Sequence, residues 1–507
     1  MKIIQTILAC TLAAASAQAK DFVTYEEFGA VGDGKTDDQK AIVAAHEAAN
    51  KQGLPVKAGA GKTYYIGKGA DVAVIKTDVD FGTANFVIDD RTLDNIRAPI
   101  FRIDPSRRPF PVKGVSRLAK AQPRLGATFP CTCLVEVQND NVKQYIRYGA
   151  NQNNGTAQKE VFLANAAGDV DPKTPIIWDY PSVTRIMAHP VDANTLVVKG
   201  GHFTTVANQA ESKYRYHSRG FAVHRSNVRI EGLRHDVTGE GEHGAPYGGF
   251  VSVTFSANVT MTGCVFTAHK TYRTIGAAGR PVSMGSYDIG ANHSVNVSYI
   301  DCRQTTDIND NRYWGLFGSN YCKNLLYDNC VFSRFDAHMG VANATVRNST
   351  LGYMGINAIG FGTFLVENTT VRSASFFNLR GDYGSTWNGE FIVRNCTFVP
   401  GNGRPVTGTL VNGSSTDWHD FGYPCSMPRR IVFDGLKIDD SHHPEQYDGP
   451  YIFAQFSKKN ISPDYVEQFP YRVTEEVVLR NVKTASGKPL TLSPNKHMFR
   501  NVKVVQK

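Results

Sequence analysis

The chain has 507 residues, of which 41% are hydrophobic and 20% charged, and its formal net charge is +9 at pH 7. This length corresponds to about three domains of average size, but the composition fits one large β-domain, because repeat structures grow by adding units. Beyond the N-terminus no segment is apolar enough to span a membrane, which excludes a transmembrane helix.

Residues 1–19 have the pattern of a secretory signal peptide. Lys2 precedes an apolar run, Ile3–Ala15, and Ala17-Gln18-Ala19 provides a cleavage site of small residues. Cleavage there removes Lys2 and leaves a net charge of +8. Ile7-Leu8-Ala9-Cys10 resembles a lipoprotein cleavage box, but cutting there would leave an apolar segment of only about seven residues. The pattern predicts a secreted or periplasmic protein, with attachment to the cell surface as the alternative.

The mature sequence opens with a glycine-rich turn, Phe28–Asp38, which precedes a helical pattern over Gln39–Lys51. Thr36 is a suitable N-cap for this helix, and Asp37 and Asp38 suit the positive end of its dipole. Glycine-rich turns before helices can bind phosphate, but neither a P-loop nor a dinucleotide fingerprint is complete here. We therefore expect this segment to be structural.

The same segment resembles the opening motif of the pectate-lyase superfamily of right-handed β-helix proteins. In that motif a glycine-aspartate turn and an amphipathic helix cover the first coil. The resemblance extends over residues 22–90 and about 220–505. It specifies the fold strongly and the substrate weakly, because members include lyases, glycoside hydrolases, epimerases and phage tailspikes.

Residues 95–220 do not follow the repeat described below, and their pattern predicts an inserted β-rich segment. Seven basic residues in this range are accompanied nearby by only one acidic residue, Asp104. A solvated basic loop and a role in attracting an acidic ligand both fit this composition. A secreted protein with basic and aromatic groups along a groove fits an acidic polysaccharide better than nucleic acid. The basic residues are Arg102, Arg107, Arg108, Lys113, Arg117, Lys120 and Arg124.

Between Gly232 and Asn501 the chain repeats an apolar alternation that closes on a small or turn-forming residue, as in NVTMTGCVF, NLLYDNCVF and FIVRNCTF. The closing residues follow one another at intervals of 38, 28, 19, 20 and 27 residues. Each unit is too short to bury its own apolar face, so the units must stack. The sequence predicts an all-β, right-handed parallel β-helix. The markers used are Gly263, Asp301, Asn329, Asn348, Asn368 and Asn395.

These patterns divide the chain into four parts: residues 1–19 as the signal peptide, 20–94 as the N-terminal cap and first coils, 95–220 as the insertion, and 221–507 as the β-helix that carries the groove. Four cysteines directly follow a marker, and in stacked coils they would form an interior column, since free cysteine behaves as a small buried hydrophobe. They are Cys264, Cys302, Cys330 and Cys396.

Polar residues of chemical interest concentrate in the coils with the longest insertions. Arg334, Asp336 and His338 alternate with apolar residues, which places them on one face of a strand. His269 and Lys270, like Asp307, follow their markers by six or seven residues, and adjacent coils lie about 4.8 Å apart. We therefore expect one shared ridge, extended by Arg273, Tyr313, Asn320, Asn378, Arg380, Asp382 and Tyr383.

This set of residue types suits β-elimination at a uronate. A base removes the C5 proton, a cationic or amide group neutralises the carboxylate, and an acid protonates the departing O4. His338, Lys270 and Tyr313 are the candidates for proton transfer, and Arg334 is the candidate for carboxylate neutralisation. The candidate substrate-binding residues are His269, Arg273, Asn320, Arg380, Tyr383 and Asp336.

Two phrases, Ser333–His338 and Arg380–Gly389, resemble those of secreted bacterial β-helix proteins of glycosaminoglycan breakdown. The resemblance is to lyases of the chondroitin and hyaluronan type, and it implies an acidic, uronate-containing substrate. It assigns no individual catalytic role.

Two other functions remain open at this point. A glycoside hydrolase needs two carboxyl groups about 5–5.5 Å or 6.5–9.5 Å apart, which Asp307 or Asp310 with Asp336 could provide. The polygalacturonase-type Gly-His-Gly and Arg-Ile-Lys signatures are absent. The other alternative is a noncatalytic carbohydrate-binding protein. Residues 307–310 offer oxygens that suit Ca²⁺, but four such residues in a turn are commonly just a turn. We therefore assign no metal ligand and leave the cofactor open, with Ca²⁺ as the candidate.

Overall fold

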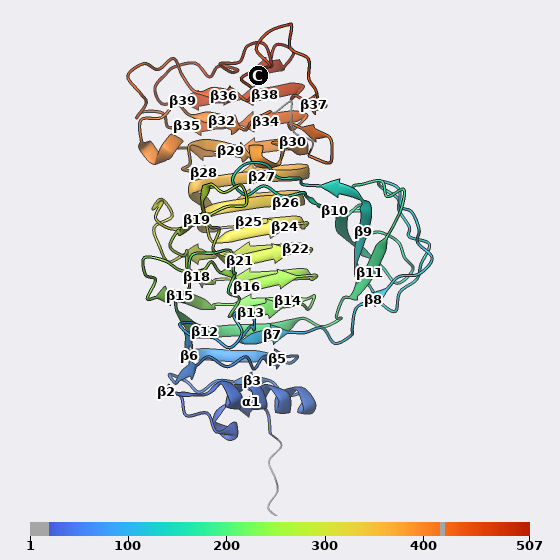
Figure 1. Cartoon of the computed structure of the whole chain (residues 1–507), viewed down its shortest axis with the longest axis vertical. Helices are drawn as coiled ribbons and strands as arrows, with labels where there is room; N and C mark the ends of the chain where they lie inside the picture. Colours follow the sequence, from blue (N-terminus) through green and yellow to red (C-terminus); the bar gives the residue numbers. More distant parts are fainter. Residues whose placement is uncertain (1–19, 416–420, 507) are drawn as a thin grey trace, which may run out of the picture.

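A computed structural model describes residues 20–415 and 421–506. Over these residues the chain forms a parallel β-helix, in which successive coils contribute to one continuous sheet of 32 strands (Figure 1). The stack includes β6 (Val79–Asp89) near its N-terminal end and β40 (Lys503–Gln506) at its C-terminal end. The predicted fold class is confirmed. The predicted signal peptide lies outside the described residues.

Helix α1 (Gln39–Gln52) covers the N-terminal end of the stack (Figure 1). The N-cap is Asp38 and not the predicted Thr36, which lies in the preceding strand. The Asp38 carboxylate accepts hydrogen bonds from the backbone N–H groups of Val31 at 2.7 Å and Gly32 at 3.2 Å. Asp38 therefore closes the glycine-rich turn against the start of the helix. The helix buries one face, formed by Ala41, Ile42, Ala45, His46 and Ala49.

The closing residue of each repeat adopts the left-handed αL conformation. Glycine reaches this region at no steric cost, and asparagine and aspartate visit it more readily than other residues. The predicted markers thus correspond to a real corner of each coil. The φ angles lie between 47° and 72° at Gly232, Gly263, Asp301, Asn329, Asn348, Asn368, Asn395, Gly435 and Asn481.

The residue after each marker points into the core. Cys264, Cys302, Cys330 and Cys396 are at most 1% exposed and all are free thiols, so the predicted interior cysteine column is confirmed. Two buried hydroxyl residues, Ser349 and Thr369, occupy the equivalent places between Cys330 and Cys396.

A second corner of the coils carries a ladder of asparagine side chains. From Asn258 onward, each Nδ2 donates to the Oδ1 of the asparagine one coil earlier, at 2.9–3.2 Å. Because a side-chain amide has both donors and an acceptor, one residue type satisfies both neighbours and fixes the register of each coil on the next. The asparagine ladder consists of Asn227, Asn258, Asn296, Asn324 and Asn343.

A separate antiparallel sheet with its own apolar core lies beside the stack (Figure 1). Two strands within the range 95–220 belong to the stack itself: β7 (Phe101–Ile103) and β12 (Leu196–Val206). The inserted sheet therefore occupies the chain between these two strands. Its members are β8 (Phe110–Pro111), β9 (Cys133–Gln144), β10 (Thr156–Ala164) and β11 (Arg185–Pro190).

The inserted sheet is joined to the stack by a buried ion pair. Lys323, at the start of β25 (Lys323–Asp328), lies 2.6 Å from Glu160 of β10, and both side chains are at most 3% exposed. Glu160 also accepts hydrogen bonds from the backbone N–H groups of Ile177 and Trp178. This contact fixes the insertion against the coils that carry the site described next.

Most of the basic residues between Arg102 and Arg124 face solvent. Arg102 pairs with Asp104, and Arg124 pairs with Asp169. No helix within residues 20–415 and 421–506 is long and apolar enough to cross a membrane.

Candidate functional site

A cavity of about 700 Å³ lies on the flank of the stack, where it is bordered by the insertion. Its floor is formed by neighbouring strands: β21 (Tyr287–Asn292), β24 (Phe317–Asn320), β26 (Val331–Arg347), β27 (Thr350–Glu367) and β29 (Ser375–Leu379). We call it the arginine cavity, because Arg147, Arg334 and Arg380 line it. None of the basic residues from Arg102 to Arg124 is among its lining residues.

His338 occupies the floor of the arginine cavity. Its Nδ1 lies 2.7 Å from Asn320 Oδ1, and Asn320 Nδ2 donates to Asn292 Oδ1 at 2.8 Å. Since the Asn320 amide nitrogen is engaged with Asn292, its oxygen accepts the Nδ1–H of His338. This arrangement leaves Nε2 with a free lone pair, and Nε2 has no hydrogen-bond partner among the described residues.

The environment of His338 keeps its imidazole neutral. Burial lowers its pKa well below the ordinary value, and the positive charges of Arg380, Arg334 and Arg147 lower it further. The Tyr383 ring meets the imidazole edge to face at a centroid distance of 5.3 Å. A neutral imidazole with a free Nε2 can accept a proton.

Arg334 provides unused hydrogen-bond donors beside His338. The residue is 2% exposed, and its Nη2 lies 2.6 Å from Asp336 Oδ2. Its Nε and Nη1 have no hydrogen-bond partner within the described chain. A Cβ at position 315 would come within 2.6 Å of the Arg334 side chain, so Gly315 makes room for it. Burial raises the pKa of Asp336, an effect that Arg334 and Arg380 oppose.

Arg147 and Arg380 share one carboxylate. Arg147 Nε and Arg380 Nη2 each lie 2.7 Å from Asp382 Oδ2, and both guanidinium groups lie 5.1 Å from the centre of the Tyr383 ring. Arg147 comes from the loop between β9 and β10, so the insertion contributes a wall of the cavity. Three guanidinium groups face two carboxyl groups, Asp336 and Asp382, which leaves an excess of positive charge that suits an anion.

Part of the predicted site is brought together in this cavity. His338, Arg334, Asn320 and Arg380 line it. Tyr383 packs beneath His338 and the two arginines, and Asp336 is buried behind Arg334.

Lys270 and Arg273 lie elsewhere, in an open cavity of about 760 Å³ that we call the lysine cavity. The prediction of one shared ridge is wrong for these two residues. After β18 (Val265–Phe266) the chain leaves the stack and forms a hairpin of β19 (Arg273–Ile275) and β20 (Pro281–Ser283). Tyr313 is also outside the arginine cavity: it packs against the core, and its carbonyl accepts the Tyr353 hydroxyl.

Asp307 and Asp310, the carboxylates considered for hydrolysis, also lie outside the arginine cavity. Asp307 is exposed and caps its own turn by accepting the Asn309 N–H at 2.9 Å. Asp310 is held by Arg312 at 2.6 Å. Neither lines the arginine cavity, and no group of three or more His, Cys, Asp or Glu side chains with metal-binding geometry occurs in the part of the chain that the structure describes.

Several residues of the cavity were not predicted from the sequence. Arg147 belongs to the insertion, where the repeat gives no positional information. Tyr214 and Tyr216 line the cavity from the segment that leads back to the stack, and Tyr287 lines it from β21. The alternation of two tyrosines with Arg215 is the only sequence signal that could have indicated them, since alternate residues of an extended chain share a face.

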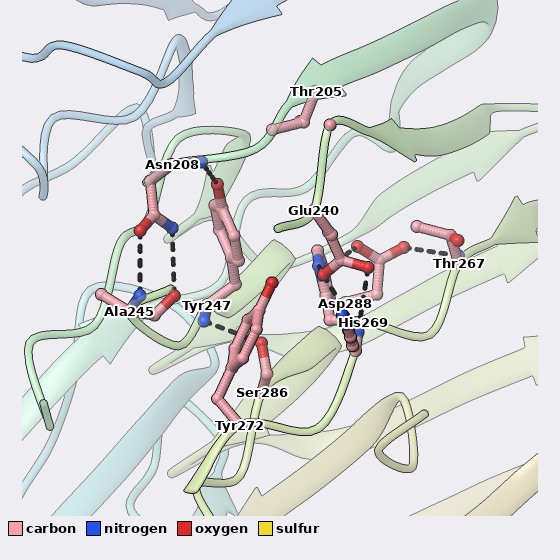
Figure 2. A network of polar contacts seen from close by, with 12 residues as sticks. Thr205, Asn208, Glu240, Ala245, Tyr247, Thr267, His269, Tyr272, Ser286 and Asp288 are labelled. Atoms are coloured by element: carbon pink, nitrogen blue, oxygen red, sulfur yellow. Dashed lines mark hydrogen bonds and ion pairs between the residues drawn. The ribbon is translucent and has the colours of Figure 1, made fainter. Parts of the chain in front are cut away.

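His269 lies in a buried network and not in a cavity. Its Nε2 lies 3.2 Å from Asp288 Oδ1 (Figure 2). The same oxygen lies 2.7 Å from His235 Nδ1. Glu240 lies on the other side of His269, at 3.5 Å from Nδ1. Burial disfavours the charged imidazole, but the carboxylates of Asp288 and Glu240 outweigh the effect of burial and raise the pKa of His269 to about 9. The two histidines hold the pKa of Asp288 at about 2 despite burial.

This network predicts how stability depends on pH. Unfolded aspartate titrates near 3.9 and unfolded histidine near 6.5. The contribution of Asp288 is present above about pH 4 and is lost as the pH falls towards 2. The contribution of His269 is present below about pH 6.5 and is lost as the pH rises through 9. We expect His269→Gln to flatten the alkaline decline of the free energy of unfolding, measured in urea from pH 6 to 10. An unchanged slope in this variant would contradict the assignment.

No family model matches the sequence. One curated relative, the "Depolymerase, capsule KL64-specific" of Klebsiella phage P510, is 28% identical over 150 residues, which cover 24% of this chain and 14% of that protein. Among solved structures, the tailspike gp61 of Pseudomonas phage phi297 is 14% identical with a TM-score of 0.58, covering 96% of this chain and 84% of that chain. The tailspike gp49 of Pseudomonas phage LKA1 is 13% identical with a TM-score of 0.55, covering 95% and 84%.

The likeness to these structures is one of fold. Both tailspikes align with nearly the whole chain at low sequence identity, which supports the parallel β-helix architecture. The curated relative shares only a short segment, about a seventh of its own length.

Proposed function

We propose that the chain is an exported polysaccharide lyase that cleaves an acidic, uronate-containing glycan by β-elimination. The observation that carries this proposal is the combination of a neutral His338, with Nε2 free, and unused Arg334 donors in one cavity. The curated relative is by its name a capsule depolymerase, which supports a polysaccharide as the class of substrate.

The proposed reaction uses the groups of the arginine cavity. The free donors of Arg334 bind the uronate carboxylate and stabilise the negative charge that develops when C5 loses its proton. His338 Nε2 takes this proton. The C4–O4 bond then breaks, a C4=C5 double bond forms, and O4 receives a proton from a tyrosine hydroxyl of the cavity, Tyr216 or Tyr287. The imidazolium and the tyrosinate return to their starting states by proton exchange with solvent.

Hydrolysis by paired carboxylates fits the cavity less well. A glycoside hydrolase needs one carboxyl group as acid and another as base or nucleophile. Among the described lining residues Asp382 is the only carboxylate, and it is engaged by Arg147 and Arg380. Asp336 lies behind Arg334 and is fully buried. A noncatalytic glycan-binding function is the remaining alternative. An activity measurement distinguishes it from both enzymatic functions.

The deciding experiment is incubation with a panel of uronate-containing polysaccharides, including chondroitin and hyaluronan, while ultraviolet absorbance is followed for the new C4=C5 bond. Product masses separate the two enzymatic alternatives, because hydrolysis adds a water molecule and elimination does not. Products with saturated ends would favour the hydrolase. Binding without cleavage across the panel would favour the noncatalytic function.

Removing the Arg334 donors should slow elimination by about 10²–10³-fold, as for one preorganised donor aimed at developing charge. Arg334→Gln is best combined with Asp336→Asn, so that no unpaired carboxylate is left buried. The matched control is Asp336→Asn alone, which retains Arg334 and should keep most of the turnover measured on the same glycan. If Asp336→Asn alone abolishes activity, Asp336 takes part in the chemistry and the hydrolase becomes the better assignment.

A further inference from the structure

One segment, residues 211–217, separates the arginine cavity from a smaller cavity on its other side. Tyr214 and Tyr216 line the arginine cavity, whereas Lys213, Arg215 and His217 line a cavity of about 300 Å³. Successive side chains of this segment therefore line opposite cavities, which makes the segment a wall between them. We call the segment the strap and the smaller space the strap cavity.

The strap cavity has a polar, buried floor. Asp90 lines it, is 1% exposed, and lies 3.3 Å from the equally buried Arg219. Its Oδ2 is left without a hydrogen-bond partner among the described residues. Burial raises the pKa of Asp90 to about 7 although Arg219 opposes the shift. The unpartnered Oδ2 is available to hydrogen-bond a ligand.

The rim of the strap cavity is basic and exposed. Lys213 and Arg215 stand on the strap, and Arg91 lies opposite on the loop that follows β6. Lys213 is 2.8 Å from Glu211 in an exposed pair, and Arg215 forms no ion pair within residues 20–415 and 421–506. Arg91 is paired with Asp89 at 2.5 Å and Glu211 also lines the cavity, so Arg215 provides the unpaired positive charge of the rim. A buried group with unused hydrogen-bonding capacity beneath this charge suits a hydroxyl-rich, negatively charged ligand of small size.

We propose that the strap cavity binds a further sugar unit of the same anionic chain that occupies the arginine cavity. This inference rests on the proposed function and deepens it: the substrate is a polymer that crosses the strap. Tyr214 and Tyr216 contact the sugar on the reactive side. The Asp90 carboxyl hydrogen-bonds sugar hydroxyls on the other side, and Lys213 and Arg215 attract acid groups of the chain.

The test compares long and short substrates for the variant Lys213→Ala/Arg215→Ala. From the panel above we would use a polymer that the wild type cleaves and the shortest oligosaccharide of the same glycan that it still cleaves. The KM for the polymer should rise about tenfold, as expected for the loss of two exposed charge contacts. The kcat for both substrates and the KM for the oligosaccharide should stay unchanged.

The matched control is Arg429→Ala/Lys437→Ala, which removes two exposed charges from the C-terminal coils without touching any of the three cavities. The strap variant should also lose much of the salt dependence of the polymer KM, because the Debye length falls from about 30 Å at 0.01 M to about 8 Å at 0.15 M ionic strength. The control should retain it.

An unchanged polymer KM in the strap variant, or an equal rise for polymer and oligosaccharide, would overturn the inference and leave the proposed function intact. If the wild type cleaves no glycan of the panel, the lyase proposal fails. Calorimetric titration with the same polymers then decides the inference separately: weaker polymer binding by the strap variant supports it, and equal binding or no binding by wild type and variant rejects it.

Discussion

His338→Ala should lower turnover on the cleaved glycan by about 10²–10⁴-fold, the usual contribution of a positioned base. His338 has a neutral imidazole whose Nδ1–H is held by Asn320, which fixes the tautomer, and its Nε2 has no hydrogen-bond partner among the described residues. Its low pKa implies that kcat/KM in the wild type persists below pH 6.5, where an ordinary histidine would already be protonated. Initial rates of unsaturated product formation measure both effects.

Two variants serve as controls for His338. Lys270→Ala and His243→Ala alter groups of the lysine cavity, and both should remain near wild type in turnover. If Lys270→Ala is as impaired as His338→Ala, the reaction takes place outside the arginine cavity. Circular dichroism of His338→Ala should match the wild type, because the residue is only partly buried.

Lys323→Met should reduce the free energy of unfolding by about 3–5 kcal/mol, because it leaves the Glu160 carboxylate buried without its partner. Burial lowers the pKa of Lys323 while Glu160 opposes that shift, which marks the two groups as one interdependent pair. The matched variant Lys323→Met/Glu160→Gln removes both charges and keeps an acceptor for the N–H groups of Ile177 and Trp178. It should recover most of the lost stability.

Urea unfolding at pH 7 measures this contrast. A loss below about 1 kcal/mol in Lys323→Met would indicate that solvent reaches Glu160 and that the insertion is attached mainly by apolar contacts. Because Glu160 and Arg147 lie on the same inserted sheet and its β9–β10 loop, loosening the insertion should also reduce activity on the glycan.

The repeat carried most of the information about the fold. A closing Gly, Asn or Asp is predictable as a corner because few other residues adopt positive φ, and the residue that follows is then inward by alternation. The same reasoning placed Arg334 and His338 correctly on one face, since β26 continues through both without leaving the stack.

The other residues of the site could not be predicted from the repeat, for physical reasons. Counting residues from a marker holds only while the chain stays in the coil, and after Phe266 it departs into a hairpin that carries Arg273 away. His269 is buried because it pairs with the carboxylates of Asp288 and Glu240, and these contacts join segments that are distant in the sequence. Arg147 reaches the cavity from the insertion, 235 residues before its partner Asp382.

The asparagine ladder has a consequence for how such a protein can change in length. Each amide must give a hydrogen bond to one neighbour and receive one from the other, so removing part of a coil leaves both neighbours unmatched. Removing one complete turn lets the flanking amides meet again. Length is therefore quantised in whole coils, and losing one between His338 and Arg380 would move these groups about 4.8 Å relative to each other. A displacement of this size is too large for the two groups to contact the same substrate atoms as before. The number of coils between His338 and Arg380 is therefore fixed by the reaction, whereas the number of coils at the two ends of the solenoid can change.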